Sequence, residues 1–182
     1  MWTRLGKLLQ IAQGDRPMIA ALLLQALCTG IFVGALELEA NTVFLEAYGA
    51  DRVPFALMLS GVVGILIAAI YGYFSKQLKI RSFGILNLLV VIGATAFLLG
   101  GAHFVDLDYL DFATFVFSGP LILITLLGFW TTVSGFLSPS RGKQLSGLIE
   151  VALVGGMALA LLATPFLVMK GFTIHEVLYT GM

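Results

Sequence analysis

Polar side chains inside long apolar stretches are the residues of this chain that could do chemistry. Gln25, Thr29 and Glu39 share one helical stripe with Phe32 and Leu36, because these residues follow one another at steps of four, three, four and three along the first span. Such groups are costly in a membrane unless they face a cavity or a partner. The stripe therefore predicts one side of an aqueous solute pathway. Alternatively, Glu39 and the nearby Glu37 already lie at the outer membrane surface.

A second candidate face lies in the fourth apolar stretch. Thr125 and Thr132 recur there at helical spacing, with Ser118, Gly128 and Gly135 on the same side. This face predicts a polar channel between helices. Equally, threonine hydroxyls in membrane helices can bond only to the carbonyls of their own backbone.

Glu150 is the third candidate, one turn into the fifth apolar stretch. It can pair with Arg141 or Lys143 at the mouth of that span, or it can face a cavity. Together these positions give a predicted substrate-binding set of Gln25, Thr29, Glu39, Thr125, Thr132 and Glu150.

Several other chemistries find no support in the residues. His103 and His175 have no cysteine or second histidine at ligand spacing, so we expect neither a metal site nor a cofactor. The sequence holds no GxGxxG, Walker A, GxSxG or HExxH pattern, which argues against an enzyme. The few basic residues are spread over loops, so nucleic-acid binding is not expected.

The elements that must position these groups are five long apolar runs, and they make the lipid bilayer the solvent of the chain. A helix needs roughly 20 apolar residues to cross a hydrocarbon core of about 30 Å. Charged residues make up 11% of the 182 residues, against about 25% in soluble proteins, and 59% are hydrophobic. The mean hydropathy is +1.03. We predict an all-α integral membrane protein.

The apolar runs set the expected organisation. Residues 1–16 form an amphipathic helix in the membrane interface, and residues 17–182 form a transmembrane bundle that ends in the start of a sixth span at 174–182. We expect the chain to be the N-terminal part of something longer. The predicted spans are 17–40, 53–75, 82–104, 112–138 and 147–169.

Basic residues predict the orientation of the bundle. If the spans alternate, eight of the ten Lys and Arg residues fall on one side of the membrane. By the positive-inside rule that side is the cytoplasm, so we expect a multi-pass inner (plasma) membrane protein with a cytoplasmic N-terminus. The interhelical loops contribute Lys76, Lys79, Arg81, Arg141 and Lys143.

Small residues predict close helix packing, because helices in lipid associate where their backbones can approach. Three spans carry such stripes and so indicate a tight bundle. They are Gly30 and Gly34 in the first span, Gly61, Gly64, Ala68 and Gly72 in the second, and Ala152, Gly156, Ala160 and Thr164 in the fifth.

Several segments are similar to one known family. They are 42–54 (TVFLEAYGADRVP), 73–81 (YFSKQLKIR) and 139–150 (PSRGKQLSGLIE), with Phe129-Trp130 and Gly155-Gly156. These stretches resemble the bacterial ATP/ADP translocase-like proteins of the major facilitator superfamily. The resemblance implies a secondary transporter of two six-helix halves, with this chain as most of the first half and the second half in the same or another polypeptide.

The solute that the resemblance implies is a nucleotide or another anion. Those nucleotide translocases hold phosphate with lysines inside the membrane, yet no Lys or Arg occurs within the five apolar runs here. Lys76 also stands where the family's loop motif carries an acidic residue. The alternative is a non-transporting anchor or scaffold that uses the same fold to hold partner membrane subunits.

Overall fold

The protein is all-helical over the residues that the computed structural model describes, which are 16–77, 85, 87–97, 109–137 and 139–169. The helices α2, α3, α5 and α6 are each long and apolar enough to cross a membrane, which agrees with the predicted membrane class. The described elements are α2 (Arg16–Tyr48), the short 3₁₀ helix η2 (Ala50–Arg52), α3 (Val53–Gln77), a shorter apolar helix (Asn87–Phe97), α5 (Leu110–Phe136) and α6 (Pro139–Met169).

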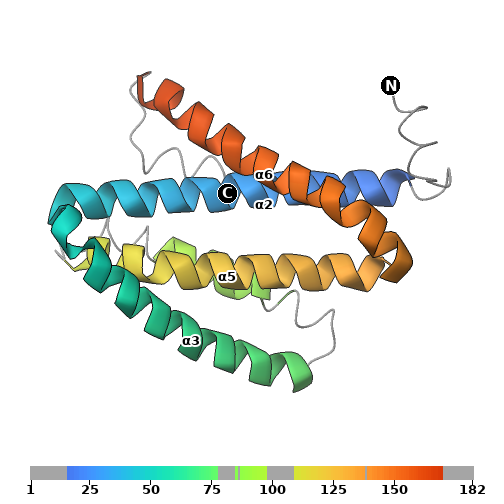
Figure 1. Cartoon of the computed structure of the whole chain (residues 1–182), viewed down its shortest axis with the longest axis horizontal. Coiled ribbons are helices and arrows are strands. Elements are labelled where there is room, and N and C mark those ends of the chain that lie inside the picture. The colour runs from blue at the N-terminus through green and yellow to red at the C-terminus, as the bar shows by residue number, and fades with distance from the viewer. Residues whose placement is uncertain (1–15, 78–84, 86, 98–108, 138, 170–182) are drawn as a thin grey trace.

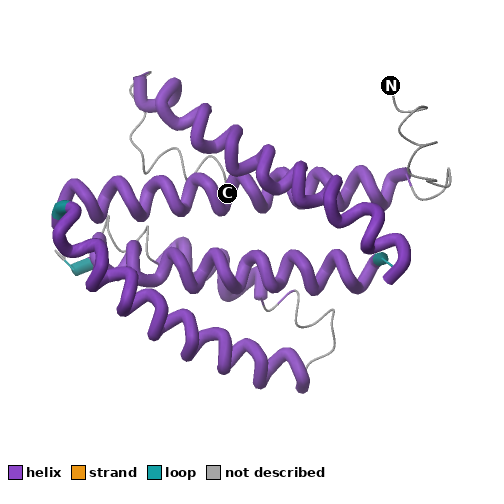
Figure 2. The backbone as a smooth tube through the Cα atoms, in the orientation of Figure 1, coloured by secondary structure: helices purple, strands orange, loops and turns teal. Residues whose placement is uncertain are grey.

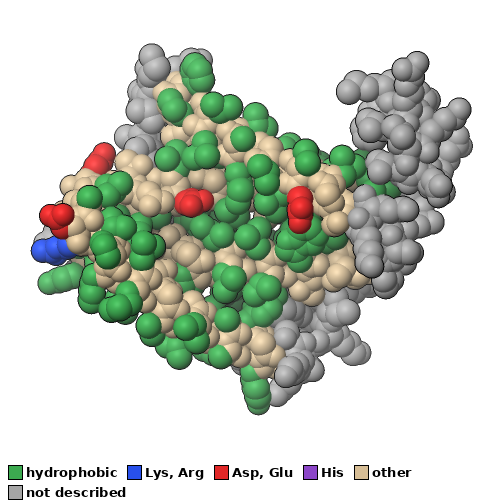
Figure 3. All heavy atoms as spheres, in the orientation of Figure 1, with side chains coloured by type: hydrophobic (Ala, Val, Ile, Leu, Met, Phe, Trp, Pro, Cys, Tyr) green, Lys and Arg blue, Asp and Glu red, His purple; other side chains and the backbone are tan. Residues whose placement is uncertain are grey.

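Helices α3 and α5 run in one direction, and helices α2 and α6 run in the opposite direction (Figure 1). In Figures 1 and 2, α2 ends where α3 and α5 begin, and α6 begins where α5 ends. This puts Arg16, Lys76, Arg141 and Lys143 toward one end of the bundle, as the alternating spans predict. Lys79 and Arg81 lie outside the described residues. Charged side chains also gather at the opposite end, where α2 meets α3 (Figure 3).

Two helices run further than their apolar runs predict. The first span continues to Tyr48 instead of residue 40, because residues 38–47 include leucine, alanine and glutamate, which favour helix. The next residue, Gly49, terminates the helix with a φ of 74°, which only glycine adopts readily. The last helix begins at Pro139 instead of residue 147, since proline is favoured in a first helical turn. The predicted interfacial helix at 1–16, apart from Arg16, and the sixth span at 174–182 lie outside the described residues.

Among the described helices, α2 and α6 approach each other closely, backbone to backbone, at a crossing of two glycines. A Cβ atom on Gly30 would overlap the carbonyl oxygen of Leu153, and one on Gly156 would overlap the carbonyl oxygen of Leu27. One turn along, a Cβ on Gly34 would stand 3.0 Å from the Cα of Met157. The stripes predicted for the first and fifth spans therefore do bring two backbones together.

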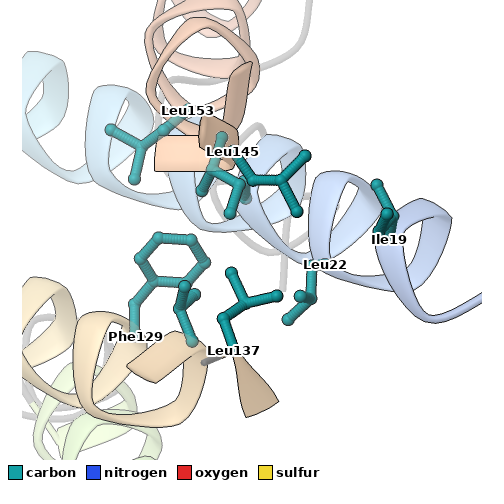
Figure 4. Packing of buried hydrophobic residues seen from close by; sticks show 9 residues of the cluster. Ile19, Leu22, Phe129, Leu137, Leu145 and Leu153 are labelled. Carbon is teal, nitrogen blue, oxygen red and sulfur yellow. The ribbon is translucent and has the colours of Figure 1, made fainter. Parts of the chain in front are cut away.

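Three buried clusters extend this contact along the bundle. The largest joins α2, α5 and the first half of α6, and Figure 4 shows Ile19, Leu22, Phe129, Leu137, Leu145 and Leu153 converging there. A smaller one, around Leu36 and Leu121, continues it, and a third holds α3 to α2 and α5. In the third cluster Phe44 stacks on Phe115 with ring centroids 4.3 Å apart.

The stripe predicted for the second span does not make a comparable contact. A Cβ on Gly61 would meet nothing within 4 Å among the described residues, and the nearest atom to one on Gly64 is Pro120 Cγ at 3.8 Å. Most large apolar side chains of α3, such as Ile65 and Leu66, are exposed. Among the described residues, α3 is held mainly through its first turns, where Ala56 is buried, and Gly61 is exposed.

We expect Gly30→Ala to lower the thermal stability of the purified protein. The new methyl group must move α2 away from α6, and overpacking of this kind costs about 1–3 kcal/mol. The measurement is the melting temperature in detergent. The matched control is Gly61→Ala, where the methyl group has open space and alanine favours helix by roughly 0.5–1 kcal/mol over glycine. Equal melting temperatures for the two variants would contradict the glycine crossing.

Candidate functional site

A cavity of about 520 Å³ lies between α2, α5 and the helix Asn87–Phe97. Four of the six predicted substrate-binding residues line it: Gln25, Thr29, Thr125 and Thr132. Their helical spacing is what brought them together, since residues on one face of each helix meet in the same gap. The remaining lining residues are Ile85, Asn87, Leu88, Val91, Gly128, Phe129, Gly135 and Phe136.

The threonines of α5 both line the cavity and bond to their own helix. The hydroxyl of Thr125 donates to the carbonyl oxygen of Leu121 at 2.8 Å, and that of Thr132 donates to the carbonyl of Gly128 at 2.9 Å. The threonines thus make the backbone bonds named as one alternative and also line a cavity, while a continuous polar channel stays a prediction. Each hydroxyl hydrogen is used by the backbone, which leaves the oxygen lone pairs as the groups available to a ligand.

Asn87 is a lining residue that the sequence reasoning missed. Its Nδ2 donates to the carbonyl oxygen of Ile124 at 3.4 Å, while its buried Oδ1 has no hydrogen-bond partner among the described residues. The amide occupies the space where a side chain at position 128 would stand, so Gly128 is required for its placement. An amide inside the third apolar run was the signal that could have found it.

Glu39 lies apart from the cavity. It is ten residues beyond Thr29, which is about 15 Å along α2 at a rise of about 1.5 Å per residue. Between them, Leu36 is buried in a cluster that joins α2, α5 and α6. Glu39 is only 1% exposed, whereas Glu37 is exposed. Glu39 therefore does not line the cavity, and its side chain is enclosed by helices.

Glu150 lies on an exposed face of α6 and does not line the cavity. Pairing with Arg141 or Lys143 stays a prediction, because the side chains of both lie outside what the structure describes. Within the described part of the chain, no three His, Cys, Asp or Glu side chains gather in a way that could hold a metal ion. The predicted six-residue set thus divides into four cavity residues, one enclosed carboxyl and one exposed carboxyl.

Comparisons of the chain with protein-family models, curated proteins and solved structures find no match. What the cavity can bind therefore follows from its own residues. The described lining consists of apolar, amide and hydroxyl groups and contains no ionisable side chain.

We expect the cavity to admit water-soluble reagents. In a Cys28→Ser background, which removes the single native cysteine, Thr29→Cys and Thr132→Cys are expected to react readily with a hydrophilic methanethiosulfonate. Ala26→Cys is the control, because Ala26 is 0% exposed and lies one turn before Thr29 on α2. The measurement is the labelled fraction against time by mass spectrometry. Similar rates at positions 26 and 29 would contradict an accessible cavity.

Proposed function

We propose that this chain is a solute-transporting membrane module of the major facilitator type. The observation that carries the proposal is the half-open cavity with amide and hydroxyl groups, lined by the membrane-length helices α2 and α5 and by the helix Asn87–Phe97. Polar space of this kind is costly to keep between membrane helices unless it is used, and ligand sites in helical transporters lie between helices near the middle of the membrane.

The pattern of helix contacts supports a repeat architecture. Helix α2 packs on α6 and α5, and α3 packs on α5. If α2 and α5 each begin a three-helix unit, then the second helix of each unit packs against the first helix of the other. Helices α2 and α5 run in opposite directions (Figure 1), which is the relation expected of inverted repeats. The cavity lies between these two first helices, where such repeats form their binding sites.

Glu39 is our candidate for a second functional group in the cycle. A carboxyl group enclosed by membrane-spanning helices is a functional-site hypothesis by default, because its ionised form is costly there. Glu150, on the exposed face of α6, is placed where a second bundle or a partner could contact it. Under the resemblance, that partner is the other six-helix half.

A scaffold function is the second candidate. The observation that favours it is the exposed apolar surface of α3, with Leu57, Met58, Ile65 and Leu66 all more than half exposed. Lipid or partner subunits can cover such a surface. A protein of this kind would need no solute cavity, so a transport assay separates the two candidates.

The proposed orientation has a direct test. In the Cys28→Ser background, Asp51→Cys and Arg16→Cys place exposed thiols at opposite ends of the bundle. With the N-terminus in the cytoplasm, a membrane-impermeant thiol reagent added to intact spheroplasts labels Asp51→Cys, and it labels Arg16→Cys only after lysis. The reverse pattern would overturn the proposed orientation.

The proposed transport activity is tested by reconstitution. We expect the protein, purified with any copurifying subunit and inserted into vesicles, to take up at least one of radiolabelled mannitol, ethanolamine and ATP faster than protein-free vesicles do. Gln25→Ala should reduce that uptake by about tenfold, the effect of one lost ligand hydrogen bond. Thr131→Val is the control, because Thr131 neighbours the cavity residue Thr132 but does not line the cavity.

Glu39→Gln and Glu150→Gln complete the same series. A loss of uptake in Glu39→Gln alone would assign the enclosed carboxyl to the transport cycle, and unchanged uptake in both would remove these residues from the mechanism. If none of the three probes enters the vesicles, the transport proposal fails and the scaffold function is favoured.

A further inference from the structure

We infer that the cavity selects solutes that donate hydrogen bonds and carry no negative charge, such as polyols or small amines. This inference rests on the proposed function, because it names the solute class of the same cavity. It follows from which hydrogen-bond donors of the lining residues already bond to other groups of the protein.

The α5 side of the cavity can only accept. Thr125 and Thr132 give their hydroxyl hydrogens to the carbonyls of Leu121 and Gly128, at 2.8 and 2.9 Å. Their oxygens keep free lone pairs, and a hydroxyl whose hydrogen is committed presents only these to a ligand. Turning the hydrogen toward a ligand acceptor would break the bond to the backbone, so an acceptor gains little.

Asn87 adds a third acceptor beside them. Its Nδ2 donates one hydrogen to the carbonyl oxygen of Ile124, and this fixes the orientation of the amide, so that Oδ1 and the second Nδ2 hydrogen remain. That oxygen is buried without a hydrogen-bond partner among the described residues. A buried carbonyl oxygen without a partner is unfavourable, so a ligand donor that bonds to it gains binding free energy.

The opposite side of the cavity is neutral and can both donate and accept hydrogen bonds. Gln25 and Thr29 of α2 make no hydrogen bond to other described residues, so each can donate or accept. Counted together, the two threonine hydroxyls of α5 only accept, Asn87, Gln25 and Thr29 can do both, and the described lining has no side chain with a positive charge. A phosphate needs several donors or a cation, because an anion accepts hydrogen bonds and does not donate them.

Polyols and small amines both offer hydrogen-bond donors, and they differ in charge. A polyol offers several O–H donors, and an ammonium group offers three N–H donors with a positive charge that acceptor oxygens stabilise. The cavity supplies acceptors for both, and the volume of about 520 Å³ is within the range of small-molecule sites. A nucleotide or another anion, which the family resemblance implies, is therefore a poor match for this part of the bundle.

The test is equilibrium binding of radiolabelled mannitol, ethanolamine and inorganic phosphate to the purified protein in detergent. We expect mannitol or ethanolamine to bind and phosphate not to bind, and the preferred one of the two identifies the charge of the ligand. Thr132→Val should weaken that binding about tenfold, because it removes one acceptor and keeps the shape of the side chain. Thr131→Val is the matched control, since its hydroxyl makes the same kind of bond, to Leu127 O at 2.7 Å, outside the cavity.

The results separate a failure of this inference about the solute from a failure of the proposed transport function. Binding of phosphate, or of none of the probes, overturns the inference about solute class. Equal weakening by Thr131→Val and Thr132→Val also overturns it, because the effect would then come from the helix and not from the cavity. Uptake of ATP without binding of mannitol or ethanolamine would leave the transport proposal in place. Binding of mannitol or ethanolamine without uptake of any probe would leave the inference and remove transport.

Discussion

The backbone contact between Gly30 and Gly156 is the constraint on which the rest of the bundle depends. In lipid there is little hydrophobic drive to bring helices together, so close backbone approach must supply the contact area. At this crossing, any side chain on either glycine would overlap the other helix. With α2 and α6 held at this distance, the apolar clusters on both sides bring α5 against them, and α3 follows through its contact with α5.

The cavity exists because one face of α2 and α5 carries small and polar residues that do not fill the space between the helices. Where the facing residues are large and apolar, as at Leu36 and Leu121, the two helices pack against each other. Toward the other end Phe129 and Val133 of α5 still pack on Leu22 and Ala26 of α2. The cavity lies beside this cluster, where Gln25, Thr29, Thr125 and Thr132, together with two glycines, do not fill the gap. The hydroxyl bonds to the backbone lower the cost of that polar surface, because each threonine hydrogen has a partner even when the cavity holds only lipid or water. A polar site can therefore persist in a membrane bundle without charge.

Much of this arrangement could be predicted from sequence, and the exceptions have physical causes. Periodicity placed Gln25 with Thr29 and Thr125 with Thr132, because helical spacing determines which side chains share a face. Spacing could not tell which small-residue stripe meets a partner, so the glycines of α3 were expected to pack and Gly61 instead faces open space. Nor could it show that Asn87 fits over Gly128, since this depends on how two helices far apart in sequence are placed. Helix ends were missed at Tyr48 and Pro139 because polar residues can extend a helix beyond the membrane.

The close α2–α6 crossing and the sparse contacts of α3 bear on how such a module could move. Alternating access requires bundles that shift as rigid bodies, with a binding site exposed first to one side and then to the other. At the α2–α6 crossing the backbones leave no room for a side chain at Gly30 or Gly156, so we expect these two helices to move together. Helix α3 has few buried side chains beyond its first turns, and its outer face is apolar and exposed. We therefore expect a motion that opens the cavity to change the contacts of α3 and of the helix Asn87–Phe97 before it separates α2 from α6. Asn87 lines the cavity from this helix and bonds to Ile124 of α5, so such a motion would change its position in the site.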